Sequence, residues 1–180
     1  MLSVVVATVT DQVRVYDLDD DDSVLTTTDL DAGDLATFVR EREQAPGAPP
    51  PRWVWSDTAT WYPPLLAAGV TVARCWDLRL CHAILRASAL TAHTSFASAD
   101  ASVWDQPRTQ TGADRLFDLE PPVRLDPLEE LRRQRRAVAA ARTDDGRPAS
   151  GSLSLLLAAE SAGSLVATIV RSSERAVSLW

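Results

Sequence analysis

Lysine and asparagine are both missing from this chain of 180 residues, and it has only two cysteines. All 18 basic side chains are therefore arginine, and with 25 carboxylates the formal net charge is −7. Because affinity for duplex DNA comes largely from neutralising phosphates, this balance disfavours free-standing DNA binding. Binding to DNA would need a local basic patch or a basic neighbouring domain. Codons for both missing residues are AT-rich, so their absence indicates a high-GC genome and carries no information about the chemistry of the protein.

The scarcity of cysteine also limits metal chemistry. Cys75 falls in an expected strand and Cys81 in the following helix, which is typical of two buried thiols in a reducing compartment. His82 adjoins Cys81, but adjacent residues of a helix do not share a face, so a joint metal site is disfavoured. The apolar run 4–9 has no basic lead, and no other run has the length of a signal peptide or membrane span. These features predict a cytoplasmic protein.

The first half of the chain alternates between two hydrophobic periodicities. Asp31 or Gly33 is placed to cap the first helix, Gly69 to end the second, and Asp77 to cap the third. Between them, the prolines of 45–51 indicate a loop. The order β-β-β-α-β-α-β-α predicts an α/β protein with a mixed five-stranded sheet, in the ribonuclease H-like arrangement. The expected strands are 2–9, 13–18, 23–28, 52–55 and 70–76, and the expected helices begin near residues 34, 58 and 78.

The second half is expected to be helical after an irregular stretch. Residues 89–122 are rich in small and polar side chains and predict a flexible linker or insertion, on which Trp104, Leu116 and Phe117 are possible anchors. Asp126 opens a helix to Arg142, and an apolar helix follows at 153–170. This gives three parts, namely an α/β domain at 1–88, the linker at 89–122, and a helical segment at 123–180.

Two blocks of sequence carry a family resemblance. The block RWVWSDTATWYPPLLAAGVTVARCWDLRLCHAILR, and the block LSLLLAAESAGSLVATIV followed by VSLW, resemble the 3′–5′ exonuclease domain of family A (DNA polymerase I-like) polymerases and its passage into the polymerase thumb. The resemblance implies a ribonuclease H-like fold and a role in DNA replication or repair. It also implies that the polymerase centre lies beyond Trp180, so the ending at VSLW is interpreted as a truncation.

The chain lacks the residues that the exonuclease chemistry of the resembled family requires. Such a nuclease needs carboxylates that converge on two divalent ions. The family's Asp-x-Glu on the first strand has no counterpart before Asp11, and its next aspartate falls on Trp61, a turn from Asp57. The Tyr-x-x-x-Asp of the last helix is also absent from 126–142. We therefore expect no catalytic residue, no metal site and no cofactor in this chain, with Mg²⁺ serving only a parent polymerase.

A few residues keep two interpretations. Asp77 follows the fifth strand, where the family also has an aspartate, and its role as a helix cap explains it. Glu160 either pairs with an arginine such as Arg136 or faces water. The tryptophans at 53, 55 and 76 fit core positions better than nucleotide stacking. The basic face formed by Arg132, Arg133 and Arg136 is the candidate DNA-binding element, although a solvated helix face is the commoner explanation.

Three functions remain open. The leading one is a catalytically degenerate exonuclease-like domain that positions the polymerase module of the same or a longer chain, and DNA through it. The alternative is a stand-alone interaction module, without a membrane role, that binds a protein or itself through the apolar helix 153–170. The third is a nuclease with a rearranged site at Asp11, Asp17 and Asp57.

Overall fold

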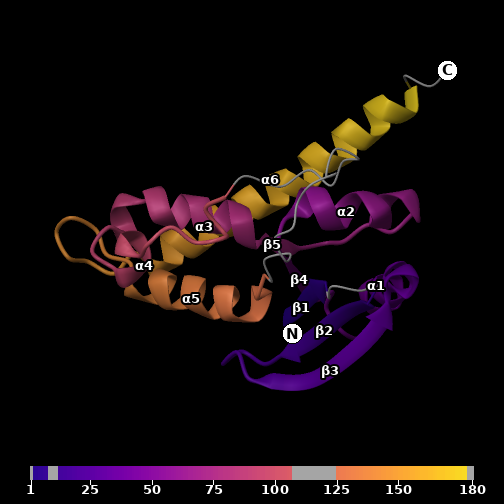
Figure 1. Ribbon diagram of the computed structural model, residues 1–180, viewed down its shortest axis with the longest axis horizontal. Helices are drawn as coiled ribbons and strands as arrows, with labels where there is room; N and C mark the ends of the chain where they lie inside the picture. The colour runs from indigo at the N-terminus through magenta and orange to yellow at the C-terminus, as the bar shows by residue number, and fades with distance from the viewer. Residues whose placement is uncertain (1, 8–11, 107–124, 178–180) are drawn as a thin grey trace, which may run out of the picture.

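The computed structural model describes residues 2–7, 12–106 and 125–177, and it is a mixed α/β fold, as predicted (Figure 1). The described part of the chain begins with three strands and then alternates helix and strand, in the expected order. The strands are β1 (Leu2–Ala7), β2 (Gln12–Leu18), β3 (Val24–Asp31), β4 (Arg52–Trp55) and β5 (Cys75–Asp77). The helices are α1 (Leu35–Glu43), α2 (Thr58–Ala67), α3 (Leu78–Ala87), α4 (Ser95–Ser98), α5 (Pro127–Ala140) and α6 (Ser150–Val177), with short 3₁₀ helices η1 (Ala32–Asp34) and η2 (Ala89–Thr91).

The five strands form one sheet in the order β3-β2-β1-β4-β5. Strand β2 pairs antiparallel with β1 and β3, whereas β1, β4 and β5 pair in parallel. A row of paired residues crosses the parallel part, from Val4 to Val54 to Trp76. The carboxyl ends of β4 and β5 therefore lie at the same edge, where helices α2 and α3 begin.

Strands β4 and β5 are buried on both faces, because their alternate residues enter two separate cores. Trp53 and Trp55 of β4 pack with helices α1 and α2, while Val54 between them packs with α3, α5 and α6. Trp76 joins Val54, and Cys75 joins the tryptophans of the other face. The sequence prediction that the strand tryptophans are core residues is confirmed, since Trp53, Trp55 and Trp76 are 0%, 1% and 7% exposed.

Most helix ends agree with their sequence signals. Gly69 has φ of 70° and ends α2, and the amide of Val70 donates to the carbonyl of Leu65 at 2.8 Å in the arrangement typical of glycine-ended helices. Asp31 and Gly33 are exceptions. The 3₁₀ turn η1 precedes α1, and Asp31 before it makes no side-chain capping bond.

Several predicted boundaries are wrong. The fifth strand covers only Cys75–Asp77 rather than 70–76, because β4 has just four residues with which it can pair. Pro63 and Pro64 lie in the second turn of α2, where each removes an N–H donor from the helix.

Residues 89–106 form a packed segment, which corrects the prediction of a flexible linker for this part. The segment contains η2 and α4, and it buries Thr91, Phe96 and Trp104. Trp104 is thus an anchor, as proposed, and it packs in the same core as Val54 and α5. The candidate anchors Leu116 and Phe117 lie outside the described residues.

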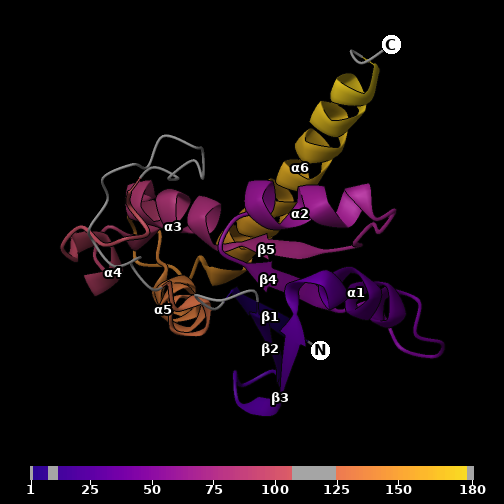
Figure 2. The same cartoon turned by 45° about the vertical axis from the view of Figure 1, so that its right-hand side comes forward.

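Helix α6 is longer than predicted, 28 residues in place of the 18 expected. Its first half lies against α3, α5 and β5, and its second half lies along α2. Figures 1 and 2 show that its last turns run beyond the other elements.

Candidate functional site

Two acids considered in the sequence analysis, Asp57 and Asp77, lie at the edge formed by the carboxyl ends of β4 and β5. Asp57 accepts the amide of Thr60 at 2.8 Å and so caps α2. Asp77 accepts the amide of Leu80 at 3.0 Å, and its second oxygen accepts the amide of Thr58 at 2.8 Å. One buried carboxylate therefore holds the first turns of two helices, and the predicted capping role of Asp77 is confirmed.

The other positions at this edge also serve the fold. Trp61 donates from its indole Nε1 to the hydroxyl of Ser56 at 3.0 Å, and it is partly buried. Asp17 lies away from the edge on β2, where Arg42 donates to it at 2.8 Å and Thr26 bonds it as well. Asp11 lies outside the described residues. Within residues 12–106 and 125–174, no group of three His, Cys, Asp or Glu side chains is arranged to hold a metal ion.

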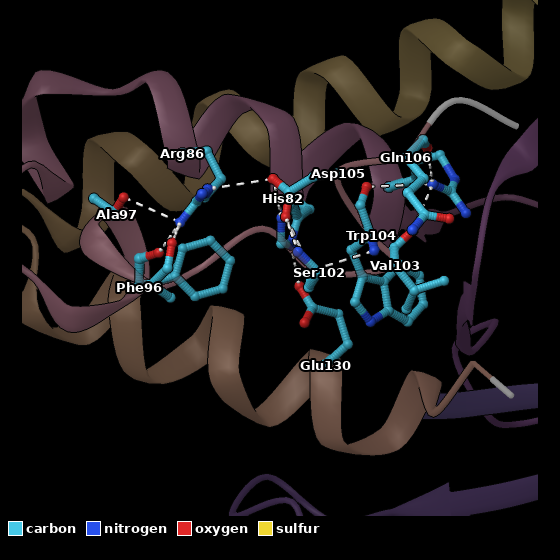
Figure 3. A network of polar contacts seen from close by, with 12 residues as sticks. His82, Arg86, Phe96, Ala97, Ser102, Val103, Trp104, Asp105, Gln106 and Glu130 are labelled. Carbon is cyan, nitrogen blue, oxygen red and sulfur yellow. Dashed lines mark hydrogen bonds and ion pairs between the residues drawn. The ribbon is translucent and has the colours of Figure 1, made fainter. Parts of the chain in front are cut away.

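A buried polar cluster around His82 joins helices α3 and α5 to the segment before residue 107 (Figure 3). The Nδ1 atom of His82 lies 2.7 Å from a carboxylate oxygen of Glu130, and its Nε2 lies 3.1 Å from Asp105. Gln134 donates to the same Glu130 oxygen at 2.8 Å and accepts the indole N–H of Trp76 at 2.9 Å. The side chains of His82, Glu130 and Gln134 are almost fully buried, so the cluster acts as an internal cross-link rather than as an accessible catalytic site.

Two arginines of α3 hold the loop residues that approach this cluster. Arg86 donates to the carbonyls of three residues in 96–99, and its Nε lies 3.3 Å from Asp105. Arg79 donates to the carbonyls of Val103, Trp104 and Gln106. Burial alone would raise the pKa of Asp105, but hydrogen bonds from Ser102 and His82 outweigh it and lower the pKa to about 2.

Sequence reasoning missed this cluster. The sequence places His82 next to Cys81, whereas the partners that it contacts lie 23 and 48 residues further along the chain. A signal was present, because a histidine at a core position of a helix needs polar partners. The sequence did not indicate which carboxylates supply them.

The two cysteines are free and buried, as predicted. Burial raises the pKa of both thiols to about 12. Cys75 donates to the carbonyl of Ser161 at 3.3 Å, and Cys81 lies 3.5 Å from the hydroxyl of the same serine. Both thiols therefore belong to the contact between the sheet, α3 and α6, and neither is prepared for nucleophilic chemistry.

The predicted basic face of α5 is partly used inside the molecule. Arg132 donates to the carbonyl of Asp22 at 2.9 Å, and Arg133 lies over the ring of Phe96 and 3.4 Å from Glu130. Arg136 is exposed and pairs with Glu129 at 2.9 Å. The suggested pairing of Arg136 with Glu160 is therefore not made, and Glu160 is exposed on α6.

The surface of α6 that points away from the domain carries large apolar side chains, with Glu160 among them. We call it the outer face of α6. The positions 155, 159, 162, 166 and 169 are all exposed, and their alternating spacing of four and three residues is that of a coiled-coil seam. The large side chains of this face are Leu155, Leu156, Val166, Ile169 and Val170, which are 39–72% exposed.

This helix corrects one expectation from the sequence. Residues 150–174 are long and apolar enough to cross a membrane by length and composition, although we expected no run of that kind. Only 28% of the apolar window is buried. The inner face of the helix nevertheless bonds to the domain, since Ser164 donates to the hydroxyl of Thr58 at 2.8 Å.

Comparison with known proteins supplies no assignment for these features. The chain matches no protein-family model, and comparisons with curated proteins and with solved structures gave no match.

Proposed function

We propose that this chain is a catalytically silent exonuclease-like domain of a family A DNA polymerase, with an architectural role in positioning the polymerase module. The observation that carries the proposal is the edge at the carboxyl ends of β4 and β5. Both acids there, Asp57 and Asp77, accept amide hydrogens of helix N-termini. Carboxylates used in this way do not converge on a pair of ions, so the residues present do not fit a two-metal centre.

The sheet supports the ribonuclease H-like part of the proposal. A meander followed by two β–α units gives the order β3-β2-β1-β4-β5, in which β2 alone runs against the other strands. That order is the one expected for the ribonuclease H-like arrangement. Because a fold hosts many functions, the order supports ancestry and leaves the activity to the site.

The outer face of α6 supports the architectural part. An apolar patch on a long helix usually marks a surface that another body covers. In the proposed parent enzyme that body is the polymerase module, which also supplies the Mg²⁺ chemistry and contacts DNA in the cytoplasm. The exposed Arg136 and its neighbours on α5 are the proposed phosphate-facing residues of this chain.

The first test is a nuclease assay on the purified chain. A 3′-labelled single-stranded oligonucleotide is incubated with Mg²⁺ or Mn²⁺, and the Asp57→Asn and Asp77→Asn variants serve as matched controls. We expect identical, negligible cleavage by all three proteins. Cleavage by the wild type that either variant loses would refute the silent domain and revive the rearranged nuclease.

The second test concerns the parent protein. An immunoblot of the source cell with an antibody against this domain reports the size of the native product. A band several times larger than 19.6 kDa supports the polymerase reading. A band at 19.6 kDa would limit the relation to the polymerase to common ancestry, and it would favour the alternative function below.

The alternative function is a stand-alone interaction module, and the coiled-coil spacing on the outer face of α6 is the observation that favours it. This alternative predicts that the isolated chain associates with itself or with an apolar helix of a partner. Sedimentation of the wild type and of the Val166→Glu variant distinguishes the monomer from the associated form. The substitution leaves the folded monomer largely intact, because position 166 is 60% exposed.

A further inference from the structure

A hollow of about 430 Å³ lies between the start of β4, helix α5 and the first turns of α6. We call it the α5–α6 hollow. It is separate from the edge at Asp57 and Asp77, because Arg52 stands at the amino end of β4 and those acids follow the carboxyl ends of β4 and β5. Its lining residues are Arg52, Trp76, Leu131, Arg135, Val138, Ala139, Ser150 and Ser154.

Arg52 supplies the guanidinium on which the properties of this hollow depend. Among the described residues no carboxylate forms an ion pair with its guanidinium, which instead lies 5.8 Å from the ring centre of Trp76. Burial lowers the pKa of Arg52, and repulsion from Arg74 and Arg135 lowers it further. The half-buried guanidinium thus sits among like charges, an arrangement that costs stability unless an anion compensates it.

The rest of the lining can complete an anion site. Ser150 and Ser154 add two hydroxyl groups to the lining, one helical turn apart on α6. The residue before α6 is Ala149, which has no side chain able to cap the first amides of the helix. Arg135 supplies a second guanidinium, although it also pairs with Asp22. Leu131 and Val138 add apolar walls that strengthen charge interactions inside the hollow.

We propose that the α5–α6 hollow binds the phosphate monoester group of a small molecule, with Arg52 as the main cationic ligand. The planar guanidinium of arginine matches phosphate oxygens in pairs, and serine hydroxyls donate to the remaining oxygens. The volume is that of a small-molecule pocket. The site has two guanidiniums, one of which pairs with Asp22, rather than an exposed basic row, and the chain carries a net charge of −7, so nucleic acid is disfavoured as the occupant.

Isothermal titration of the whole chain tests the proposal. The probes are inorganic phosphate, deoxythymidine 5′-monophosphate, and thymidine as the control without phosphate. We expect the monophosphate to bind with a dissociation constant below about 1 mM at low salt, and thymidine not to bind. Bound phosphate should also raise the melting temperature of the wild type.

Three variants test the residue assignment. Arg52→Gln should weaken monophosphate binding at least about tenfold, because a charged hydrogen bond is lost. Ser154→Leu should block the hollow and abolish binding while all the arginines remain. Arg14→Gln removes an exposed arginine on β2 that pairs with Asp29, and it should bind as the wild type does. Should Arg52→Gln fail to fold, the Ser154→Leu result decides.

Several outcomes would overturn the proposal. One is the absence of heat and of thermal stabilisation with both phosphate probes. Another is wild-type affinity in Ser154→Leu or in a folded Arg52→Gln. A further titration uses a short single-stranded oligonucleotide with and without a 5′-phosphate. Binding of the oligonucleotide alone, without binding of the mononucleotide, would refute a small-molecule site.

Discussion

Asp77 is the residue on which the catalytic and structural readings of this domain differ most, so its removal is the most informative perturbation. Its carboxylate is 5% exposed and accepts one amide from α3 and one from α2. Loss of the α3 cap in Asp77→Ala costs about 1 kcal/mol. The buried amide of Thr58 is then left without its partner, which costs about 1–3 kcal/mol more. We expect a total loss of about 2–4 kcal/mol in the free energy of unfolding.

Asp126 is the matched control for this prediction. It caps α5 through the amide of Glu129 at 2.9 Å, it is exposed, and no second helix depends on it. Asp126→Ala should therefore cost only about 1 kcal/mol. Urea unfolding followed by tryptophan fluorescence measures both variants, since tryptophans lie in both cores of the sheet.

The comparison has a clear point of failure. If Asp77→Ala loses no more stability than Asp126→Ala, the second hydrogen bond to Thr58 contributes nothing, and the joint clamp on two helices is refuted. A stabilised Asp77→Ala would have a different meaning. It would indicate that the carboxylate is held at a cost to stability, as acids of working active sites often are.

Three further predictions follow from named groups. The lowered pKa of Asp105 stabilises the fold above the ordinary carboxyl value of about 3.9, and this contribution is lost as pH falls toward about 2. Asp105→Asn should therefore be less stable than the wild type at neutral pH and should approach it in acid urea titrations. Cys75 and Cys81, whose pKa values burial raises to about 12, should resist a disulfide reagent at about pH 8 in the native state and react fully in denaturant. Val166→Glu should change the unfolding free energy by less than about 0.5 kcal/mol and abolish any concentration-dependent sedimentation of the wild type.

Local signals in the sequence were enough to predict the order of the first eight elements. Gly69 could be read as a helix end and Asp77 as a helix start because each role depends on a few neighbouring residues. The length of β5 could not be predicted this way. The run 70–76 is apolar enough for a strand throughout, but strand length is set by the partner, and β4 offers four residues.

The sequence could not predict contacts between distant residues either, because these also depend on partners elsewhere in the chain. The ring of His82 needs two partners, and the chain offers many carboxylates, of which packing selects Glu130 and Asp105. The composition of the segment 89–106 predicts a linker, but the structure shows a packed segment there. Its order comes from carbonyl groups held by Arg79 and Arg86, and a backbone carbonyl leaves no mark on composition.

The inner face of helix α6 combines core leucines with hydroxyls, and the hydroxyls link the helix to the clamp at Asp77. Leu153, Leu157 and Leu165 are buried in the two cores, whereas the hydroxyls lie on helix starts and a strand end that need hydrogen bonds. Ser161 accepts the amide of Asp77 at 3.2 Å, and Ser164 bonds Thr58, the residue whose amide Asp77 accepts. Large apolar residues such as Val166 also lie on the outer face, so the helix carries apolar side chains on both sides. Exposing an apolar helix face to water costs free energy, and this cost disappears when another surface covers the face. The contacts of Ser161 and Ser164 with the clamp therefore fix which side of α6 is exposed, and that side is the surface proposed above for the polymerase module.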